Sequence, residues 1–224
     1  MNQKEGDNRR PLKSRRTVLA YKIAKYLSSK KINPNQISVA SIGFSLCASL
    51  CLILVPRMSH SVWSNISLIM AASFIQCRLL CNLFDGMVAV EGKRQTPSGE
   101  LFNEIPDRIS DISIFVALGY STIYSPLCYL LGFFAALLAV MTAYVRTLAV
   151  TTGAPMSFQG PMAKQHRMAT VTIACILSVF FEPSHMEKGT IIYMTLWLLN
   201  LGTAVTLIGR TRSAYGFLEK KKHV

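Results

Sequence analysis

The chain has 224 residues, of which 51% are hydrophobic, and it carries a formal net charge of +13. This composition excludes an ordinary soluble domain, whose surface must be more polar than such a chain allows. The length is sufficient for several membrane-spanning helices, because each needs about 20 apolar residues.

The first 34 residues form a strongly basic segment, for which we expect a cytoplasmic location. The segment has no continuous apolar stretch, so it is not a secretory signal peptide. Leu19, Ile23, Tyr26 and Leu27 share one helical face, which predicts an amphipathic helix on the anionic inner surface of a membrane. The alternative is a solvated basic tail that only sets the orientation of the chain.

The apolar segments that follow predict an all-α integral membrane protein with six transmembrane helices. They are separated by proline, glycine and charged residues, and together they form a membrane domain of residues 35–210. The predicted helices cover residues 36–56, 64–90, 100–121, 126–151, 163–181 and 189–209.

The distribution of Lys and Arg predicts the orientation of these helices. These residues gather in the N-terminal segment, in the connections after the second and fourth helices, and in a basic tail of residues 211–224. Such connections stay in the cytoplasm. We therefore expect a multi-pass protein of the inner (cytoplasmic) cell membrane, with both termini and the connection 91–98 on the cytoplasmic side.

Oxygen-bearing side chains gather on both sides of the connection 91–98. They are Asn82 and Asp85 before it, and Glu100, Asn103, Glu104, Asp107 and Asp111 after it. At about 100° per residue, those of each helix fall close to one face. Ionisable groups in membrane helices are costly and are usually functional. Hard divalent cations bind such oxygens and hold phosphates for transfer.

A structural role is the alternative for single members of this group. Glu100, at a helix start, can interact with the helix dipole. Glu91 and Glu104 can pair with Lys93, Arg94 or Arg108. Arg78, one turn before Asn82, is expected to pair with an acidic residue rather than to bind substrate.

The spacing of these residues resembles the signature of the CDP-alcohol phosphatidyltransferase family, Asp-x-x-Asp-Gly-x-x-Ala-Arg followed by Gly-x-x-x-Asp-x-x-x-Asp. The sequence has Asn82-Leu-Phe-Asp85-Gly86-Met-Val-Ala89-Val90, then Gly99-Glu-Leu-Phe-Asn103-Glu-Ile-Pro-Asp107. Asn33-Pro34-Asn35 before the first helix and Arg146 in the fourth also resemble the family. The resemblance implies transfer of a phosphatidyl group from a CDP-lipid such as CDP-diacylglycerol to an alcohol, with release of CMP, by a homodimer in the bilayer.

The resemblance also implies residue roles. One or two Mg²⁺ or Mn²⁺ ions would be held by Asn82, Asp85, Asn103 and Asp107, with Asp107 as the general base. The CDP group would lie against Asn82, Asp85, Gly86, Ala89 and Gly99.

The sequence departs from the family pattern at three of these positions. Asn replaces Asp at 82 and 103, and Val90 replaces the family Arg. Glu100, Glu104 or Asp111 could restore the lost charge near an ion. Lys93 or Arg94 could replace the arginine in contacting the pyrophosphate.

A cationic group on other helices is a candidate for holding the acceptor. Arg146 lies in the fourth predicted helix, and Lys164 and Arg167 lie three residues apart near the start of the fifth. They could bind the phosphate of an acceptor such as glycerol 3-phosphate, or Lys164 and Arg167 could only anchor the helix at lipid headgroups. We expect no nucleic-acid partner. The alternative functions are a non-catalytic CDP-lipid-binding protein and a transporter or ion pathway.

Overall fold

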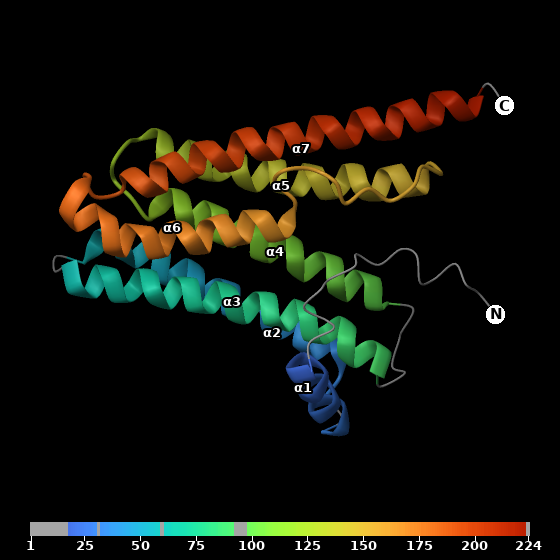
Figure 1. The fold of residues 1–224 in the computed structure, drawn as a ribbon, viewed down its shortest axis with the longest axis horizontal. Coiled ribbons are helices and arrows are strands. Elements are labelled where there is room, and N and C mark those ends of the chain that lie inside the picture. Colours follow the sequence, from blue (N-terminus) through green and yellow to red (C-terminus); the bar gives the residue numbers. More distant parts are fainter. Residues whose placement is uncertain (1–17, 31, 59–60, 92–97, 223–224) are drawn as a thin grey trace.

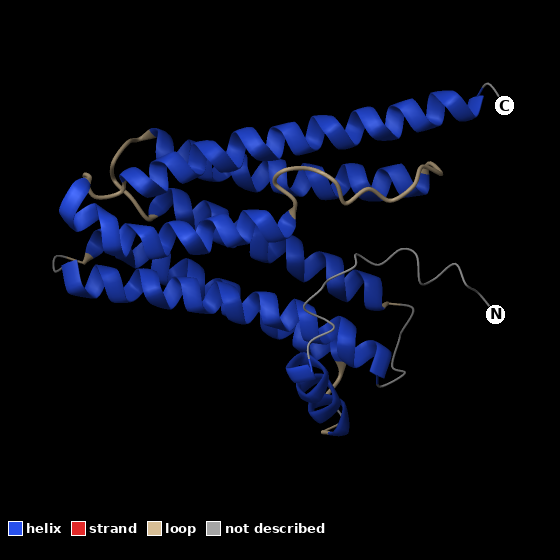
Figure 2. Cartoon of the chain, in the orientation of Figure 1, coloured by secondary structure: helices blue, strands red, loops and turns tan. Residues whose placement is uncertain are grey.

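The computed structural model describes all residues except 1–17, 31, 59–60, 92–97 and 223–224. Within this described part the chain is helical and has no β-strand (Figures 1 and 2). The helices are α1 (Val18–Ser29), α2 (Pro34–Leu54), the 3₁₀ helix η2 (Val55–Arg57), α3 (Ser61–Glu91), α4 (Gly99–Tyr120), α5 (Leu127–Thr151), α6 (Lys164–His185) and α7 (Thr190–Lys222).

Helices α2 to α7 correspond to the six predicted membrane helices. Four of them, α2 with η2, α3, α5 and α7, are long and apolar enough to cross a membrane. Helices α4 and α6 lie beside them and carry charged residues, so the count of six spans stays a prediction. The predicted end of the last helix at residue 209 is wrong, because α7 continues through the basic tail to Lys222.

The start of α2 shows how local sequence sets a helix boundary. Pro34 stands in the first turn, where its missing N–H costs nothing. The Gln36 side chain reaches back and accepts a hydrogen bond of 3.1 Å from the Asn33 backbone N–H. This contact satisfies a backbone donor that the helix itself leaves without a partner.

The six long helices pack as a closed ring in the order α2, α4, α5, α7, α6 and α3. The connections 121–126 and 186–189 lie at one end of the molecule (left in Figure 1). Helix α1, the start of α4, the connection 152–163 and the C-terminal end of α7 lie toward the other end. Helices that follow one another in the chain therefore run in opposite directions. Helices α3 and α4 are not neighbours in the ring, and they contact one another through side chains such as Asn82 and Asp107.

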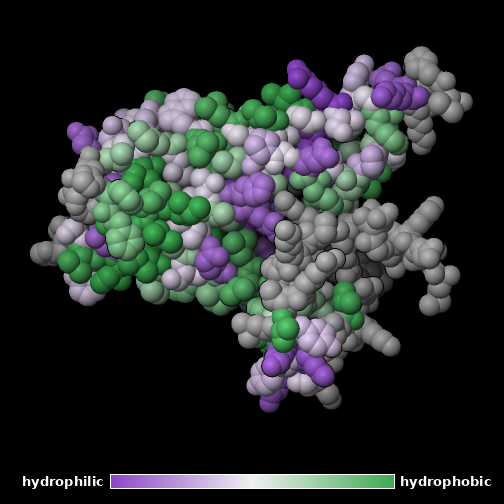
Figure 3. Space-filling model, in the orientation of Figure 1, coloured by the Kyte–Doolittle hydropathy of each residue, from purple (hydrophilic) through white to green (hydrophobic). Residues whose placement is uncertain are grey.

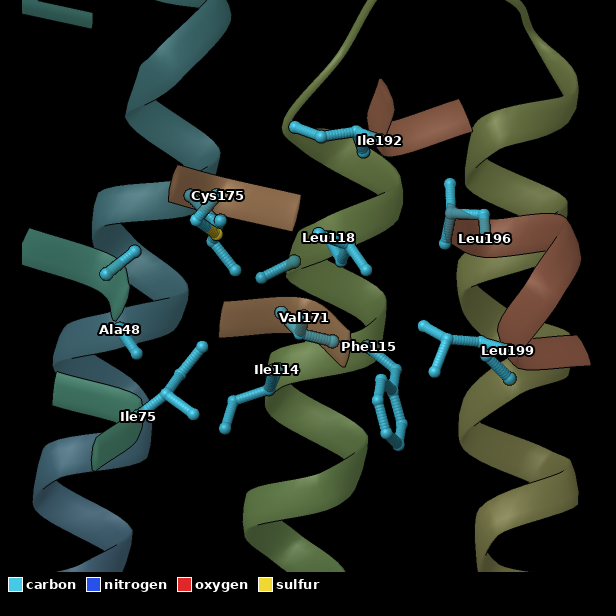
Figure 4. Close-up of a cluster of buried hydrophobic side chains, with 14 of the residues drawn as sticks. Ala48, Ile75, Ile114, Phe115, Leu118, Val171, Cys175, Ile192, Leu196 and Leu199 are labelled. Atoms are coloured by element: carbon cyan, nitrogen blue, oxygen red, sulfur yellow. The ribbon is translucent and has the colours of Figure 1, made fainter. Parts of the chain in front are cut away.

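The apolar core lies between α4 and the helices around it. Ile114, Phe115 and Leu118 of α4 are fully buried. Figure 4 shows Ile75 to one side of them, Leu196 and Leu199 of α7 to the other, and Val171 of α6 in the middle. The core therefore fixes the rotation of α4, whose polar residues lie one to three turns before these apolar ones.

One face of α2 is lined by buried serines rather than by large apolar residues. They are Ser38, Ser41, Ser45 and Ser49. Ser41, Ser45 and Ser49 donate hydrogen bonds to backbone carbonyls one turn back. Ser45 also donates to Ser110 Oγ of α4 at 2.7 Å. Small side chains of this kind let helices approach closely in membranes.

The connection 152–163 sets the start of α6. Gly160 has a φ of +131°, and a Cβ at this position would collide with Thr206 of α7. Two residues on, the Met162 N–H donates to Thr206 Oγ1 at 3.0 Å. This docking on α7 places Lys164, the first residue of α6, inside the ring.

A helix, α1, covers Val18–Ser29 of the segment for which an amphipathic helix was predicted. Ala20 and Ala24 are buried in a cluster with Met87 and Val88 of α3, while Tyr26 is exposed. The helix is thus attached to the end of α3, and its position on a membrane surface stays a prediction.

Candidate functional site

A cavity of about 490 Å³ lies among α3, α4, α5, α6 and the connection before α6. This is a usual size for a site that holds a small ligand. In Figure 3 hydrophilic side chains gather near the middle of the visible face, between apolar surfaces. The polar and aromatic residues of the wall are Gln76, Asn82, Asn103, Glu104, Asp107, Arg108, Thr142, Arg146, Phe158, Lys164, Gln165, Arg167 and Arg210.

Asp107 of α4 is the most connected acidic residue of this wall. Its Oδ1 accepts hydrogen bonds from Asn82 Nδ2 at 2.9 Å and from Arg78 Nη2 at 3.4 Å. Its Oδ2 forms an ion pair with the Lys164 ammonium group. The residue is 3% exposed. Asp107 thus presents a buried carboxylate, fixed from three directions, at the edge of an open space.

Asp85 lies one turn beyond Asn82 on α3 and is also buried. Its Oδ2 accepts a hydrogen bond of 2.7 Å from Ser38 Oγ of α2, and its Oδ1 accepts one of 2.5 Å from the Gly86 backbone N–H. Both oxygens are therefore oriented by neutral donors. Asp85 and Gly86 are not among the residues that line the cavity itself.

Asp111 lies one turn beyond Asp107 and is fully buried between two arginines. Its Oδ1 accepts from Arg78 Nη2 at 2.8 Å, and its Oδ2 accepts from Arg167 Nη2 at 3.0 Å. Arg167 also donates to Thr142 Oγ1 of α5 at 3.1 Å. Both carboxylate oxygens of Asp111 are thus taken by cations, which disfavours the predicted role of Asp111 as an ion ligand. The expected pairing of Arg78 with an acidic residue is confirmed.

Glu104 faces the cavity from the first half of α4. Its Oε1 accepts from Arg146 Nη2 at 2.5 Å, and its Oε2 accepts from Arg108 Nη2 at 3.3 Å. The Arg146 guanidinium lies 5.7 Å from the centre of the Phe158 ring. Glu104 therefore holds two cations in the wall, and its contacts are those of an ion-pair partner rather than an ion ligand.

The structure brings together most of the predicted site residues. Asn82, Asn103, Asp107, Arg146, Lys164 and Arg167 line one cavity. Ala89 and Gly99 belong to α3 and α4 but do not line it. Lys93 and Arg94 lie outside the described residues, as does the side chain of Glu100.

Arg210 of α7 is a wall residue that the sequence analysis missed. It donates to the Gln159 carbonyl at 3.0 Å and to the Thr142 carbonyl at 3.0 Å. Because Arg210 lies next to the basic tail, it was interpreted only as one of the basic residues that set the orientation in the membrane. Arg210 directly follows the apolar part of α7, and nothing in the sequence distinguishes it from the basic residues of the tail.

The donor set fits a divalent cation by its chemistry. In the described part of the chain no three His, Cys, Asp or Glu residues form a group that could hold a metal ion. Asn82 and Asn103, however, add neutral amide oxygens to the carboxylates of Asp85 and Asp107. Mg²⁺ and Mn²⁺ bind such hard oxygen donors. The Lys164 ammonium beside Asp107 shows that this carboxylate already holds a positive charge.

The chain is similar in sequence to known proteins. A sequence model of the CDP-alcohol phosphatidyltransferase family matches residues 31–208. The chain is 27% identical over 180 residues to inner membrane protein YnbA of Escherichia coli, covering 80% of this chain and 84% of that protein. It is 24% identical over 197 residues to the phosphatidylinositol phosphate synthase of Corynebacterium glutamicum, covering 86% and 82%.

Two solved structures share the fold. Phosphatidylinositol phosphate synthase of Mycobacterium tuberculosis with CDP-DAG bound has a TM-score of 0.72 and 20% identity, covering 89% of this chain and 94% of that chain. The same enzyme in complex with manganese and citrate has a TM-score of 0.70 and 19% identity, covering 88% of each chain.

Proposed function

Because the chain belongs to the CDP-alcohol phosphatidyltransferase family, we propose that it moves a phosphatidyl group from CDP-diacylglycerol, or a similar CDP-lipid, to an alcohol acceptor and releases CMP. The observation that carries this proposal is that Asn82, Asn103 and Asp107 line the same cavity as Arg146 and Lys164. The oxygen donors are suited to a metal-bound nucleotide, and the cations are suited to an anionic acceptor.

The donor lies against α3 and α4 in this proposal. Asn82, Asp85, Gly86, Ala89 and Gly99 contact the CDP group. The side chains of Asn82, Asp85, Asn103 and Asp107 hold one or two Mg²⁺ or Mn²⁺ ions. A bound ion supplies positive charge that holds the pyrophosphate and stabilises charge during transfer. A solved relative contains manganese, which supports this choice of ion.

Asp107 acts as the general base. It takes the proton from the acceptor hydroxyl as that oxygen attacks the β-phosphorus of the CDP-lipid. The bond from this phosphorus to the bridging oxygen breaks, and CMP leaves with that oxygen. Asn82 and Arg78 bond Oδ1, so Oδ2 takes the proton when the acceptor hydroxyl replaces the Lys164 ammonium group that pairs with it.

The acceptor lies against the cationic wall and carries a phosphate. Arg146, Lys164, Arg167 and Arg210 come from three helices and meet at this wall. Charge-assisted hydrogen bonds from such a group suit a phosphate better than a neutral polyol. The two phosphatidylinositol phosphate synthases among the relatives support a phosphorylated acceptor. Glycerol 3-phosphate and an inositol phosphate are the first candidates.

The protein works as a homodimer in the inner membrane in this proposal, with six spans and with both termini and the cavity on the cytoplasmic side. The basic connections support this orientation, as does the likeness to an inner membrane protein of Escherichia coli.

One assay separates this function from its alternatives. Purified protein is incubated with CDP-diacylglycerol, Mg²⁺ or Mn²⁺, and glycerol 3-phosphate, inositol phosphate, inositol or serine, and CMP release is measured. We expect acceptor-dependent release with a phosphorylated acceptor. Release with none of the acceptors would contradict the transferase and favour a non-catalytic CDP-lipid-binding protein or a transporter.

A further inference from the structure

Glu104 lies between two arginines on the wall of the cavity. Its carboxylate bonds Arg146 at 2.5 Å and Arg108 at 3.3 Å, and all three residues line the same space. The Glu104 side chain is 26% exposed, so that it can be reached from the cavity. This carboxylate is neither a motif position nor part of the buried Asp111 pairs.

Arg146 is at once the partner of Glu104 and a proposed ligand of the acceptor phosphate. A guanidinium binds phosphate best through two parallel N–H groups. One of the N–H groups of Arg146, on Nη2, already donates to Glu104. A phosphate that uses this N–H group must therefore displace the Glu104 carboxylate.

We propose that Glu104 is a specificity-determining residue that competes with anionic acceptor groups for Arg146. The proposal rests on the proposed function of the cationic wall. A monoanion such as a carboxylate brings no more charge than Glu104 itself and gains little by replacing it. A phosphate monoester brings up to two charges and displaces Glu104, whose carboxylate stays paired with Arg108. The acceptors that can displace Glu104 from Arg146 are therefore phosphate monoesters.

The test measures binding of inorganic phosphate to the purified full-length protein in detergent. The midpoint of thermal unfolding is recorded against phosphate concentration at constant ionic strength and at pH 8. A ligand that binds the folded state raises this midpoint. Glu104→Gln removes the charge and keeps the shape. We expect it to tighten phosphate binding by about twofold to fivefold, as for the loss of one competing ion pair.

Two further variants separate charge from shape. Glu104→Asp keeps the negative charge in the cavity, and its phosphate affinity should stay nearer to wild type than that of Glu104→Gln. Glu187→Gln removes an exposed carboxylate at the connection between α6 and α7, and it should leave phosphate binding unchanged. If Glu104→Gln does not purify as a folded protein, Glu104→Met carries the same test. Unchanged or weaker phosphate binding in the neutral variant would overturn the proposal.

Kinetics provide the second readout. In the CMP-release assay with glycerol 3-phosphate, Glu104→Gln should lower the KM for the acceptor and leave the KM for CDP-diacylglycerol unchanged. An equal change in both KM values would contradict selective competition at Arg146. If the wild-type protein releases no CMP with any acceptor, the transferase proposal fails, and the phosphate titration still decides the role of Glu104.

Discussion

Asp107 and Asp111 lie one turn apart on α4 but have different surroundings. Asp107 faces the cavity, whereas Asp111 is enclosed by Arg78 and Arg167. We expect Asp107→Asn to lower kcat at least about 100-fold, because it removes the proposed base and keeps the side-chain shape. Steady-state CMP release on protein with unchanged helicity by circular dichroism tests this. Activity within tenfold of wild type would rule out Asp107 as the base.

Asp111→Asn should act on stability first. It leaves two buried arginines sharing a neutral partner, and breaking a buried pair in this way costs about 3–5 kcal/mol of the free energy of unfolding. Thermal unfolding in detergent should therefore give a lower Tm for Asp111→Asn than for Asp107→Asn. The reverse order would show that the Asp111 pairs do not hold the helices together.

A substitution at Asn103 tests the metal-binding proposal by adding a charge rather than removing one. It is exposed at the cavity wall, one turn before Asp107. Asn103→Asp adds a carboxylate that attracts a divalent ion, so we expect an active enzyme that needs less Mg²⁺ for its half-maximal rate. The reduction should be about twofold to fivefold, because an exposed charge contributes at most about 1 kcal/mol. A folded variant with an unchanged Mg²⁺ requirement would show that residue 103 does not face the ion.

For single residues, the sequence predicted several that line the cavity, but it did not predict all of their hydrogen-bond and ion-pair partners. The motif spacing brought Asn82, Asn103 and Asp107 to one cavity as expected. It could not show that Glu104 bonds Arg146, because that contact depends on which helix packs beside α4. Sequence periodicity shows which residues share a face of one helix, but it does not show which other helix packs against that face.

The elements were predicted well because apolar runs and proline or glycine breaks are local signals. The six expected helices agree with α2 to α7 to within a few residues, except at the end of α7. That end was missed because the charged tail was taken to stop the helix. Lys and Arg are good helix formers in water, so the helix continues beyond its apolar part.

The crossing of α4 and α5 depends on two glycines. A Cβ on Gly119 would lie 2.6 Å from the Cys128 carbonyl oxygen, and one on Gly132 would lie 2.8 Å from the Phe115 carbonyl oxygen. Gly119→Ala must therefore push the two helices apart. We expect a cost of about 1–3 kcal/mol and a lower Tm in detergent.

Gly43→Ala is the matched control within the membrane part of the chain. Gly43 lies in α2, and a Cβ there would meet no atom within 4 Å. Alanine should leave the Tm unchanged or raise it, because glycine in a helix costs about 0.5–1 kcal/mol relative to alanine. Equal effects of Gly119→Ala and Gly43→Ala would contradict close packing at the α4–α5 crossing.

The whole molecule has two chemically different ends. Aromatic pairs lie near the end that carries the connections 121–126 and 186–189: Tyr120 with Tyr129, and Tyr124 with Tyr193. Such residues favour a membrane interface, and the basic residues at the opposite end favour the cytoplasm. Both patterns agree with the proposed orientation.

Two lysines at opposite ends of α7 test that orientation. Lys188 precedes the helix and Lys220 lies near its end, and both are exposed. In a background without native cysteines, we expect a membrane-impermeant maleimide to label Lys188→Cys from outside intact cells and Lys220→Cys only after lysis. Labelling of both positions from the same side would exclude an α7 that spans the membrane.

The Arg78–Asp111–Arg167 bridge also bears on how the protein is made. In the proposed topology α4 and α6 enter the bilayer with charged residues, each costing about 2.5–3.5 kcal/mol at a helix centre. Arg78 of α3 is made before Asp111 and can neutralise it as α4 enters the bilayer, but Arg167 follows Asp111 by 56 residues in the chain. Insertion of α4 is thus assisted by the helix before it, and that of α6 by α4. A nascent chain stopped before α6 should hold α4 less securely and expose it to membrane quality-control proteases.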